Sequence, residues 1–228
     1  MLFSILDLSA LGFFLATWAI YSLIQSRNER RQTGLNARMN PHRAGWATQL
    51  LGRDNRIVDA QIVAALQNGT AFFASTALIA AGGALTILRS TREFLDVIDA
   101  LPFSTGTTTV QWEIKTIGLT VIFVYAFFKF AWSYRLFNYV AIMIGATPPS
   151  ATKGEPQAQA HAAMVARLCE AAGRHFNRGQ RAFFFALGYL GWFIGPWVLI
   201  ATSIAVAIVL LRRQLGPEAN RILGDRLT

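Results

Sequence analysis

The stretch IGLTVIFVYAFFKFAWSYRLFNYVAIMI, at residues 117–144, contains only two charged residues, Lys129 and Arg135. About 20 mainly apolar residues in a helix are enough to cross the bilayer hydrocarbon, so this stretch is long enough to span a membrane. A charge within hydrocarbon is costly unless it is hydrated, paired or able to reach the headgroups. No Asp or Glu lies in the middle of any apolar stretch of the chain. The counter-charge of Lys129 is therefore expected in a loop, in lipid or in a ligand.

The composition of the whole chain also predicts a membrane protein. Its 228 residues are 54% hydrophobic and 14% charged, with a mean hydropathy of +0.38, which is too apolar for an average soluble domain. Four stretches are long enough to span a membrane, at about 8–25, 69–88, 114–138 and 183–211. The sequence therefore predicts an all-α fold, a single polytopic membrane domain (1–228) with four transmembrane helices.

The distribution of basic residues predicts an orientation. Lys and Arg are frequent at 26–68 and 147–182, which the positive-inside rule places in the cytoplasm, with both termini external. The expected location is the inner (plasma) membrane of a bacterium. Within 147–182, apolar residues three and four positions apart predict an amphipathic cytoplasmic helix. The C-terminal arginines argue for the opposite side: Arg212, Arg213, Arg221 and Arg226.

Charge and motifs exclude several classes of function. The net charge is +9, but the arginines flank apolar segments, which favours anionic lipids of the bilayer as partners and no nucleic acid. A single cysteine, Cys169, excludes an intrachain disulfide. His161 and His175 would lie about 21 Å apart along one helix, too far to share a metal. The signatures of common hydrolases, kinases, P-loop proteins, zinc proteases and dinucleotide-binding proteins are absent. We expect no cofactor, metal or catalytic residue.

Polar residues are expected at one depth near the inner leaflet, contributed by three apolar segments. A cationic layer without a carboxylate would attract an anion or a phosphate group. The alternative is that these groups only hold the helices together, because buried amides need partners. The candidate ligand-binding residues are Asn68, Lys129, Arg135, Asn138, Asn177 and Arg181.

Three stretches resemble a known family: FFASTALIAAGG at Phe72–Gly83, FKFAWSYRLFNYVAIMIGA at Phe128–Ala146, and NRGQRAFFFA at Asn177–Ala186. They are similar to the bacterial and plant family of four-span membrane proteins known as domain of unknown function 599. The likeness covers roughly Asp7–Leu211. The resemblance implies an integral membrane protein without an assigned activity, so it implies no catalytic residue.

Three hypotheses of function follow. The first is a non-enzymatic, self-associating membrane protein that binds or passes an anionic or lipid-like ligand at the polar layer. The second is an accessory or scaffold subunit of a larger membrane complex, which small-residue helix faces and amphipathic helices would suit. The third is a lipid-modifying enzyme, for which few acids, bases or nucleophiles are available at membrane depth.

Overall fold

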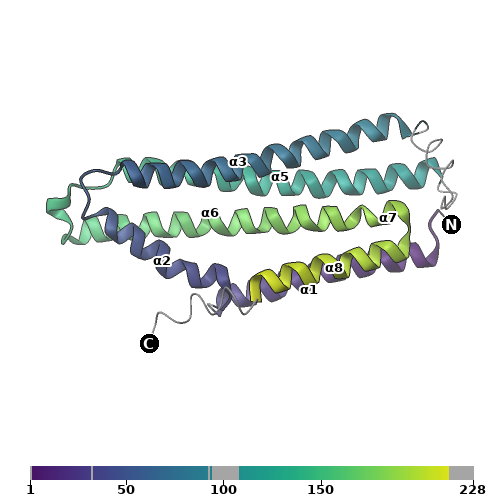
Figure 1. Cartoon of the computed structure of the whole chain (residues 1–228), viewed down its shortest axis with the longest axis horizontal. Coiled ribbons are helices and arrows are strands. Elements are labelled where there is room, and N and C mark those ends of the chain that lie inside the picture. Colours follow the sequence, from purple (N-terminus) through teal and green to yellow (C-terminus); the bar gives the residue numbers. More distant parts are fainter. Residues whose placement is uncertain (1, 32, 92, 94–107, 216–228) are drawn as a thin grey trace.

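The computed structural model describes residues 2–31, 33–91, 93 and 108–215, and these residues form helices without a strand (Figure 1). The all-α prediction is confirmed. The elements are α1 (Ile5–Arg30), α2 (Leu35–Leu50), α3 (Ile57–Arg89), α5 (Thr109–Gly145), the short 3-10 helix η1 (Ser150–Thr152), α6 (Pro156–Tyr189), α7 (Gly191–Ile194) and α8 (Pro196–Leu215).

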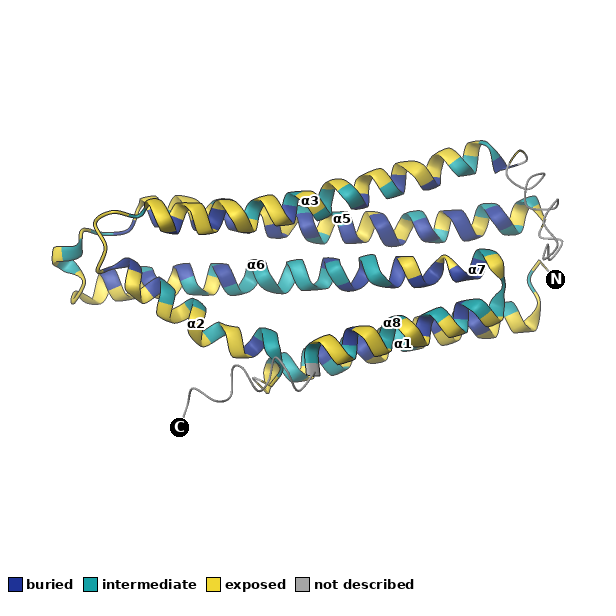
Figure 2. Ribbon diagram, viewed as in Figure 1, coloured by how far each residue is buried: buried dark blue, intermediate teal, exposed yellow. Residues whose placement is uncertain are grey.

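Three long helices, α3, α5 and α6, lie side by side along the length of the molecule, and the other helices cover α6 (Figure 1). In one half, α1 and α8 run next to each other beside α6. In the other half, α2 crosses α6 obliquely. Figure 2 shows many exposed positions on α3 and few on α6, which lies in the middle of the bundle.

Four segments are long and apolar enough to cross a membrane: one at the start of the region Ile5–Leu50, then α3, α5 and Pro196–Gln214 in α8. The number of candidate spans agrees with the sequence prediction, and the first three contain the expected ranges 8–25, 69–88 and 114–138. The helices are longer than those ranges. At 37 residues, α5 is about 55 Å long and must extend beyond a bilayer.

The expected single span at 183–211 is not a continuous helix in the structure. Helix α6 ends at Tyr189, α7 is a single turn, and α8 begins at Pro196 and folds back beside α6. A proline has no N–H for a helical hydrogen bond, and it disfavours helical backbone at the preceding residue, so the helix stops here. Gly195 is extended instead, with φ 163° and ψ 167°. The two arms of this hairpin touch where the Thr202 hydroxyl donates to the Gly188 carbonyl at 2.7 Å.

The hairpin makes α8 run parallel to α1. At one end of this pair, the ring of Phe3 stacks on Trp192, with centroids 5.4 Å apart. At the other end, Tyr21 of α1 and Leu210 of α8 line the same cavity. Helix α8 therefore begins beside the start of α1 at one end of the bundle and ends beside the end of α1, partway along the three long helices (Figure 1).

Candidate functional site

Side chains from four helices surround a polar cavity of about 200 Å³, where the ends of α1 and α8 meet α6 and the start of α2. We call it the arginine cavity. Its polar lining consists of Tyr21, Asn36, Asn177, Gln180, Arg181, Arg213 and Gln214. None of its lining residues is an Asp or Glu. The cavity is therefore rich in hydrogen-bond donors and positively charged.

Arg181 is the most buried charge of this cavity. It lies on α6 and is 6% exposed, and within the described chain its guanidinium donates no hydrogen bond. Glu29 and Tyr21 act on it electrostatically. A guanidinium has five N–H donors, and burying them without acceptors is unfavourable. The N–H groups of Arg181 therefore face the cavity without an acceptor from the described residues.

Arg213 brings a second guanidinium to the cavity from α8. Its Cζ lies 5.8 Å from the centroid of the Phe184 ring, a cation–π contact that holds the side chain in place. The N–H groups at the edge of the guanidinium plane stay available for an acceptor. Two arginines and several amides around one small space match the three acceptor oxygens of a phosphate group.

The structure separates the six residues that the sequence proposed. Asn177 and Arg181 line the arginine cavity together. The other four lie elsewhere: Asn138 between α3 and α5, Asn68 on the exposed side of α3, and Lys129 and Arg135 on α5. Arg213 and Tyr21 were missed, because they come from helices that lie next to α6 only after folding.

Lys129 has no carboxylate partner among the described residues. Its ammonium lies 5.1 Å from the centroid of the Tyr125 ring, one turn earlier on α5. Arg135 is exposed between the rings of Trp132 and Tyr139, and its Nε donates to the Tyr139 hydroxyl at 2.8 Å. Cations and amphipathic rings of this kind are typical of a membrane interface.

Asn138 fastens two helices together. Its side-chain carbonyl accepts a hydrogen bond from the Gln67 amide at 2.6 Å, between α3 and α5. For this residue the structure supports the fastening alternative. Asn68 is exposed and makes no hydrogen bond with another described residue.

We expect the Asn138–Gln67 bond to contribute only modestly to stability. Replacing either residue by Leu should lower the free energy of unfolding by about 1 kcal/mol, the scale found for hydrogen bonds between membrane helices. A double-mutant cycle with Asn138→Leu and Gln67→Leu, followed by unfolding in mixed micelles, measures the coupling. If the effects of the two single substitutions on the free energy of unfolding simply add, the hydrogen bond between Gln67 and Asn138 does not contribute to stability.

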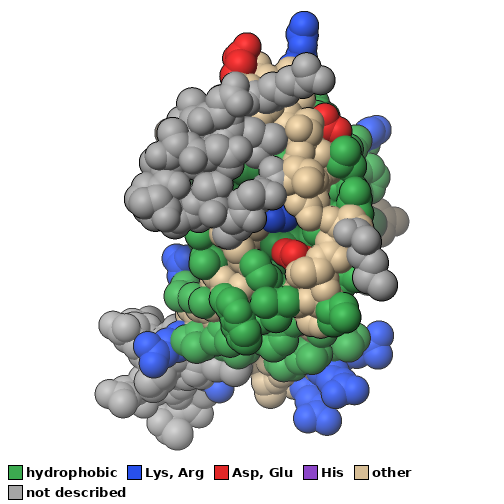
Figure 3. Space-filling model, turned by 90° about the vertical axis from the view of Figure 1, so that its right-hand side faces the viewer, with side chains coloured by type: hydrophobic (Ala, Val, Ile, Leu, Met, Phe, Trp, Pro, Cys, Tyr) green, Lys and Arg blue, Asp and Glu red, His purple; other side chains and the backbone are tan. Residues whose placement is uncertain are grey.

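The start of α1, the start of α5 and α7 bring together a second group of charged and polar side chains, at the opposite end of α1 and α8 from the arginine cavity. Lys115 is 5% exposed and donates to the Trp192 carbonyl at 2.9 Å. The Trp192 indole donates in turn to Asp7 Oδ1 at 3.1 Å, and Ser4 caps the same helix. Figure 3, which looks onto this end, shows acidic and basic side chains among hydrophobic ones.

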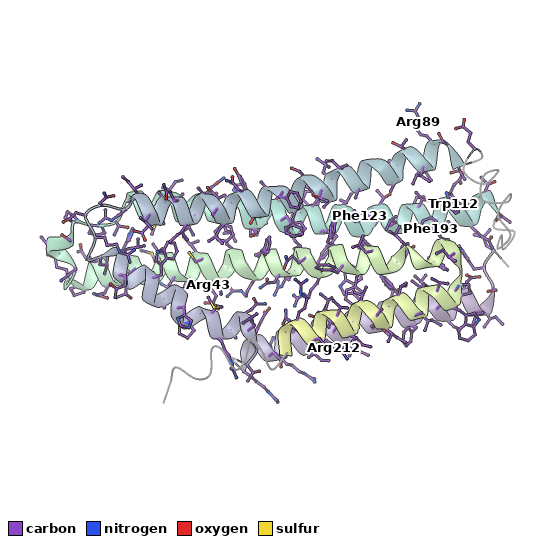
Figure 4. All side chains as sticks on the ribbon, viewed as in Figure 1. Arg43, Arg89, Trp112, Phe123, Phe193 and Arg212 are labelled. Atoms are coloured by element: carbon purple, nitrogen blue, oxygen red, sulfur yellow. The ribbon has the colours of Figure 1, made fainter. Side chains whose placement is uncertain are left out.

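The two polar ends are separated by the thickness of a bilayer core. At about 1.5 Å per residue, Arg27 lies about 30 Å from Asp7 along α1. On α8, Arg212 lies about 24 Å from Pro196. Figure 4 shows Arg212 near the end of α8, the end at which the arginine cavity lies, while Trp112 and Phe193 mark the other end. The arginine cavity therefore lies at one polar boundary of a bilayer-thick apolar layer.

The site offers no arrangement for metal binding in the described part of the chain, where no three His, Cys, Asp or Glu residues come together. The chain matches the model of a family described as "Protein of unknown function, DUF599" over residues 9–219. No curated protein and no solved structure is similar to the chain.

Proposed function

Because this chain belongs to the DUF599 family of proteins of unknown function, no activity carries over to it, and we propose that it binds the phosphate group of an anionic lipid in the arginine cavity. One observation carries the proposal. Arg181 is almost completely buried, yet within the described residues its guanidinium has no hydrogen-bond acceptor, and it faces a cavity shared with Arg213. A phosphodiester would supply the missing acceptors.

The proposal includes a position for the bilayer. The hydrocarbon would lie between the level of Asp7 and Lys115 and the level of Arg27 and Arg212. The chain from 182 to 194 contains no charged residue, so the end of α6 after Arg181 and α7 would also lie within the bilayer. The chain would then cross five times.

Five crossings place the two termini on different sides. By the positive-inside rule, the end with Arg27, Arg212 and Arg213 faces the cytoplasm. The N-terminus stays external, as the sequence analysis expected, but the C-terminal arginines now lie on the cytoplasmic side, where the rule favours them. The arginine cavity would then lie among the headgroups of the cytoplasmic leaflet, which carries anionic lipids.

A lipid is favoured over a free anion by the lining. Leu35, Phe184 and Leu210 complete the wall of the cavity beside the polar groups. A small hydrated anion would have to give up water against these apolar side chains, whereas the phosphate of a lipid is already next to hydrocarbon. The self-association, complex membership and lack of enzymatic activity inferred from the sequence stay predictions.

Lipid retention by the purified protein tests the proposal. We expect dioleoylphosphatidylglycerol to remain bound in native mass spectrometry and to raise the unfolding temperature, and dioleoylphosphatidylcholine to do neither. Arg181→Gln should weaken phosphatidylglycerol binding by about tenfold or more, because a hydrogen bond to a charged group contributes roughly 1.5–3 kcal/mol. Arg213→Gln should act in the same direction.

Arg135→Gln is the matched control. It removes the same charge from an exposed position on α5 outside the arginine cavity, so phosphatidylglycerol binding should be unchanged. If Arg135→Gln and Arg181→Gln weaken phosphatidylglycerol binding equally, only the overall charge of the protein attracts the lipid, which would contradict the proposal. If inorganic phosphate stabilises the protein and phosphatidylglycerol does not, the site binds a free anion and the lipid proposal fails.

A further inference from the structure

We infer that a second cavity, between α2 and α3, binds a hydrocarbon chain of the lipid whose phosphate occupies the arginine cavity. The inference rests on the proposed function and extends it to the class of ligand. The protein would hold an anionic lipid with one acyl chain drawn out of the bilayer along α6. We call this second space the chain cavity.

The chain cavity is large and mostly apolar. It has a volume of about 510 Å³, within the range of roughly 300–1,000 Å³ that ligand sites occupy. Its walls come from α2, α3, α5 and α6 and include Met39, Trp46, Ile62, Leu66, Phe137 and Phe176. Such a lining suits hydrocarbon and offers little to a polar ligand.

A wall residue of the chain cavity, Trp46, is held in place by a buried carboxylate. Asp59, fully buried at the start of α3, accepts a hydrogen bond from the Trp46 indole at 2.8 Å. Arg53 donates to the same Asp59 oxygen at 2.6 Å. These bonds join the end of α2 to α3, so the indole side of the cavity wall is fixed.

The arginine cavity and the chain cavity have one wall residue in common, on α6. Asn177 lines both the arginine cavity and the chain cavity. Beside it, Arg43 of α2 reaches Gly173 and donates to the Asn40 side chain at 2.6 Å, and Figure 4 shows Arg43 between α2 and α6. A ligand with a negative group at one end and an apolar chain at the other would match the cationic arginine cavity and the apolar chain cavity beside it.

The size of the chain cavity favours a hydrocarbon chain over a protein segment. A helix with its side chains is about 10 Å wide, so about 510 Å³ would hold little more than one turn of it. An extended acyl chain is much thinner and can bend to follow the walls of the chain cavity.

The chain cavity lies outside the proposed bilayer. Its wall residue Cys169 lies about 12 Å beyond Asn177 along α6, on the side away from that bilayer. A chain bound there has left the membrane hydrocarbon.

Thiol labelling can measure occupation of the chain cavity. Cys169 is the only cysteine of the chain, lies in the cavity wall and is 3% exposed. Burial raises the pKa of its thiol to about 11, although Arg43 acts in the opposite direction. It is therefore a slow reporter at neutral pH, since the thiolate is the reactive form. A cysteine at Leu66, a wall residue that is 43% exposed, is a faster one.

The experiment uses Leu66→Cys in a Cys169→Ala background, reconstituted in nanodiscs and labelled with N-ethylmaleimide. We expect dioleoylphosphatidylglycerol to slow labelling about fivefold or more relative to phosphatidylcholine alone, as burial in a filled cavity should. Dihexanoylphosphatidylglycerol, with the same headgroup and short chains, should protect much less. Met164→Cys in the same background is the control, because Met164 is also 43% exposed and lies outside both cavities.

The outcomes separate this inference from the proposed function. If phosphatidylglycerol binds by mass spectrometry but Leu66→Cys labels at an unchanged rate, the chain lies elsewhere and only this inference is overturned. If phosphatidylglycerol does not bind at all, the proposed function fails first. Protection that persists in Arg181→Gln, or is equal in phosphatidylcholine alone, would identify bulk lipid or a second copy of the protein as the occupant and would also overturn the inference.

Discussion

A green fluorescent protein fused to the C-terminus should fluoresce, and an alkaline phosphatase fused there should be inactive. This is the result expected for a cytoplasmic C-terminus, and it follows from the hairpin between α6 and α8. Because α8 folds back beside α6 after Gly195, the end of α8 lies at the same level as Arg27 and the arginine cavity. A single uninterrupted span at 183–211 would give the opposite pair of results.

A cysteine in the turn of the hairpin provides the complementary measurement. Ile194 is exposed at the end of α7, just before the turn. Ile194→Cys in a Cys169→Ala background should react with a membrane-impermeant maleimide added outside intact cells, and Arg53→Cys should react only after lysis. Each result is close to all-or-none. Labelling of Arg53→Cys in intact cells would reverse the orientation, and no labelling of Ile194→Cys at any stage would place that residue within the bilayer.

Hydropathy predicted three of the four candidate spans, because their apolar runs end in charged or polar residues. It failed at 183–211, where the apolar run continues through a reversal of the chain. A glycine–proline pair at 195–196 is a known turn signal, and the basic residues after Leu211 were a second indication. Periodicity alone could not decide between a kinked helix and a hairpin, since both bury the same residue types.

The candidate site was predictable only in part. Asn177 and Arg181 stood out because they are polar residues next to an apolar segment. Their partners Tyr21 and Arg213 come from helices that are adjacent to α6 only after folding, and no spacing in the sequence reveals that. Lys129 drew attention as a charge among apolar residues, but its stabilising contact is the ring of Tyr125 on its own helix.

Gly191→Ala should be among the most destabilising single-methyl changes in this chain, because the hairpin depends on that position. A Cβ at Gly191 would lie 2.5 Å from the Thr202 hydroxyl and 3.0 Å from the Val198 carbonyl oxygen. The hydroxyl can rotate away only by losing its bonds to Gly188 and Val198. The Val198 carbonyl belongs to the backbone of α8 and can yield only if the helix moves. Overpacking of this kind costs roughly 1–3 kcal/mol, and we expect a value of about 3 kcal/mol.

Unfolding of the purified protein in mixed micelles measures this effect, with Gly195→Ala as the control. Gly195 lies in the same turn, and a Cβ there would meet nothing within 4 Å, so stability should change little. Thr202→Ala should rescue Gly191→Ala only in part, because it removes the hydroxyl contact and leaves the Val198 carbonyl in place. Full rescue would mean that the backbones of α7 and α8 are not as close as the structure places them. Wild-type stability of Gly191→Ala would contradict the tight hairpin itself, and with it the fifth crossing on which the position of the arginine cavity depends.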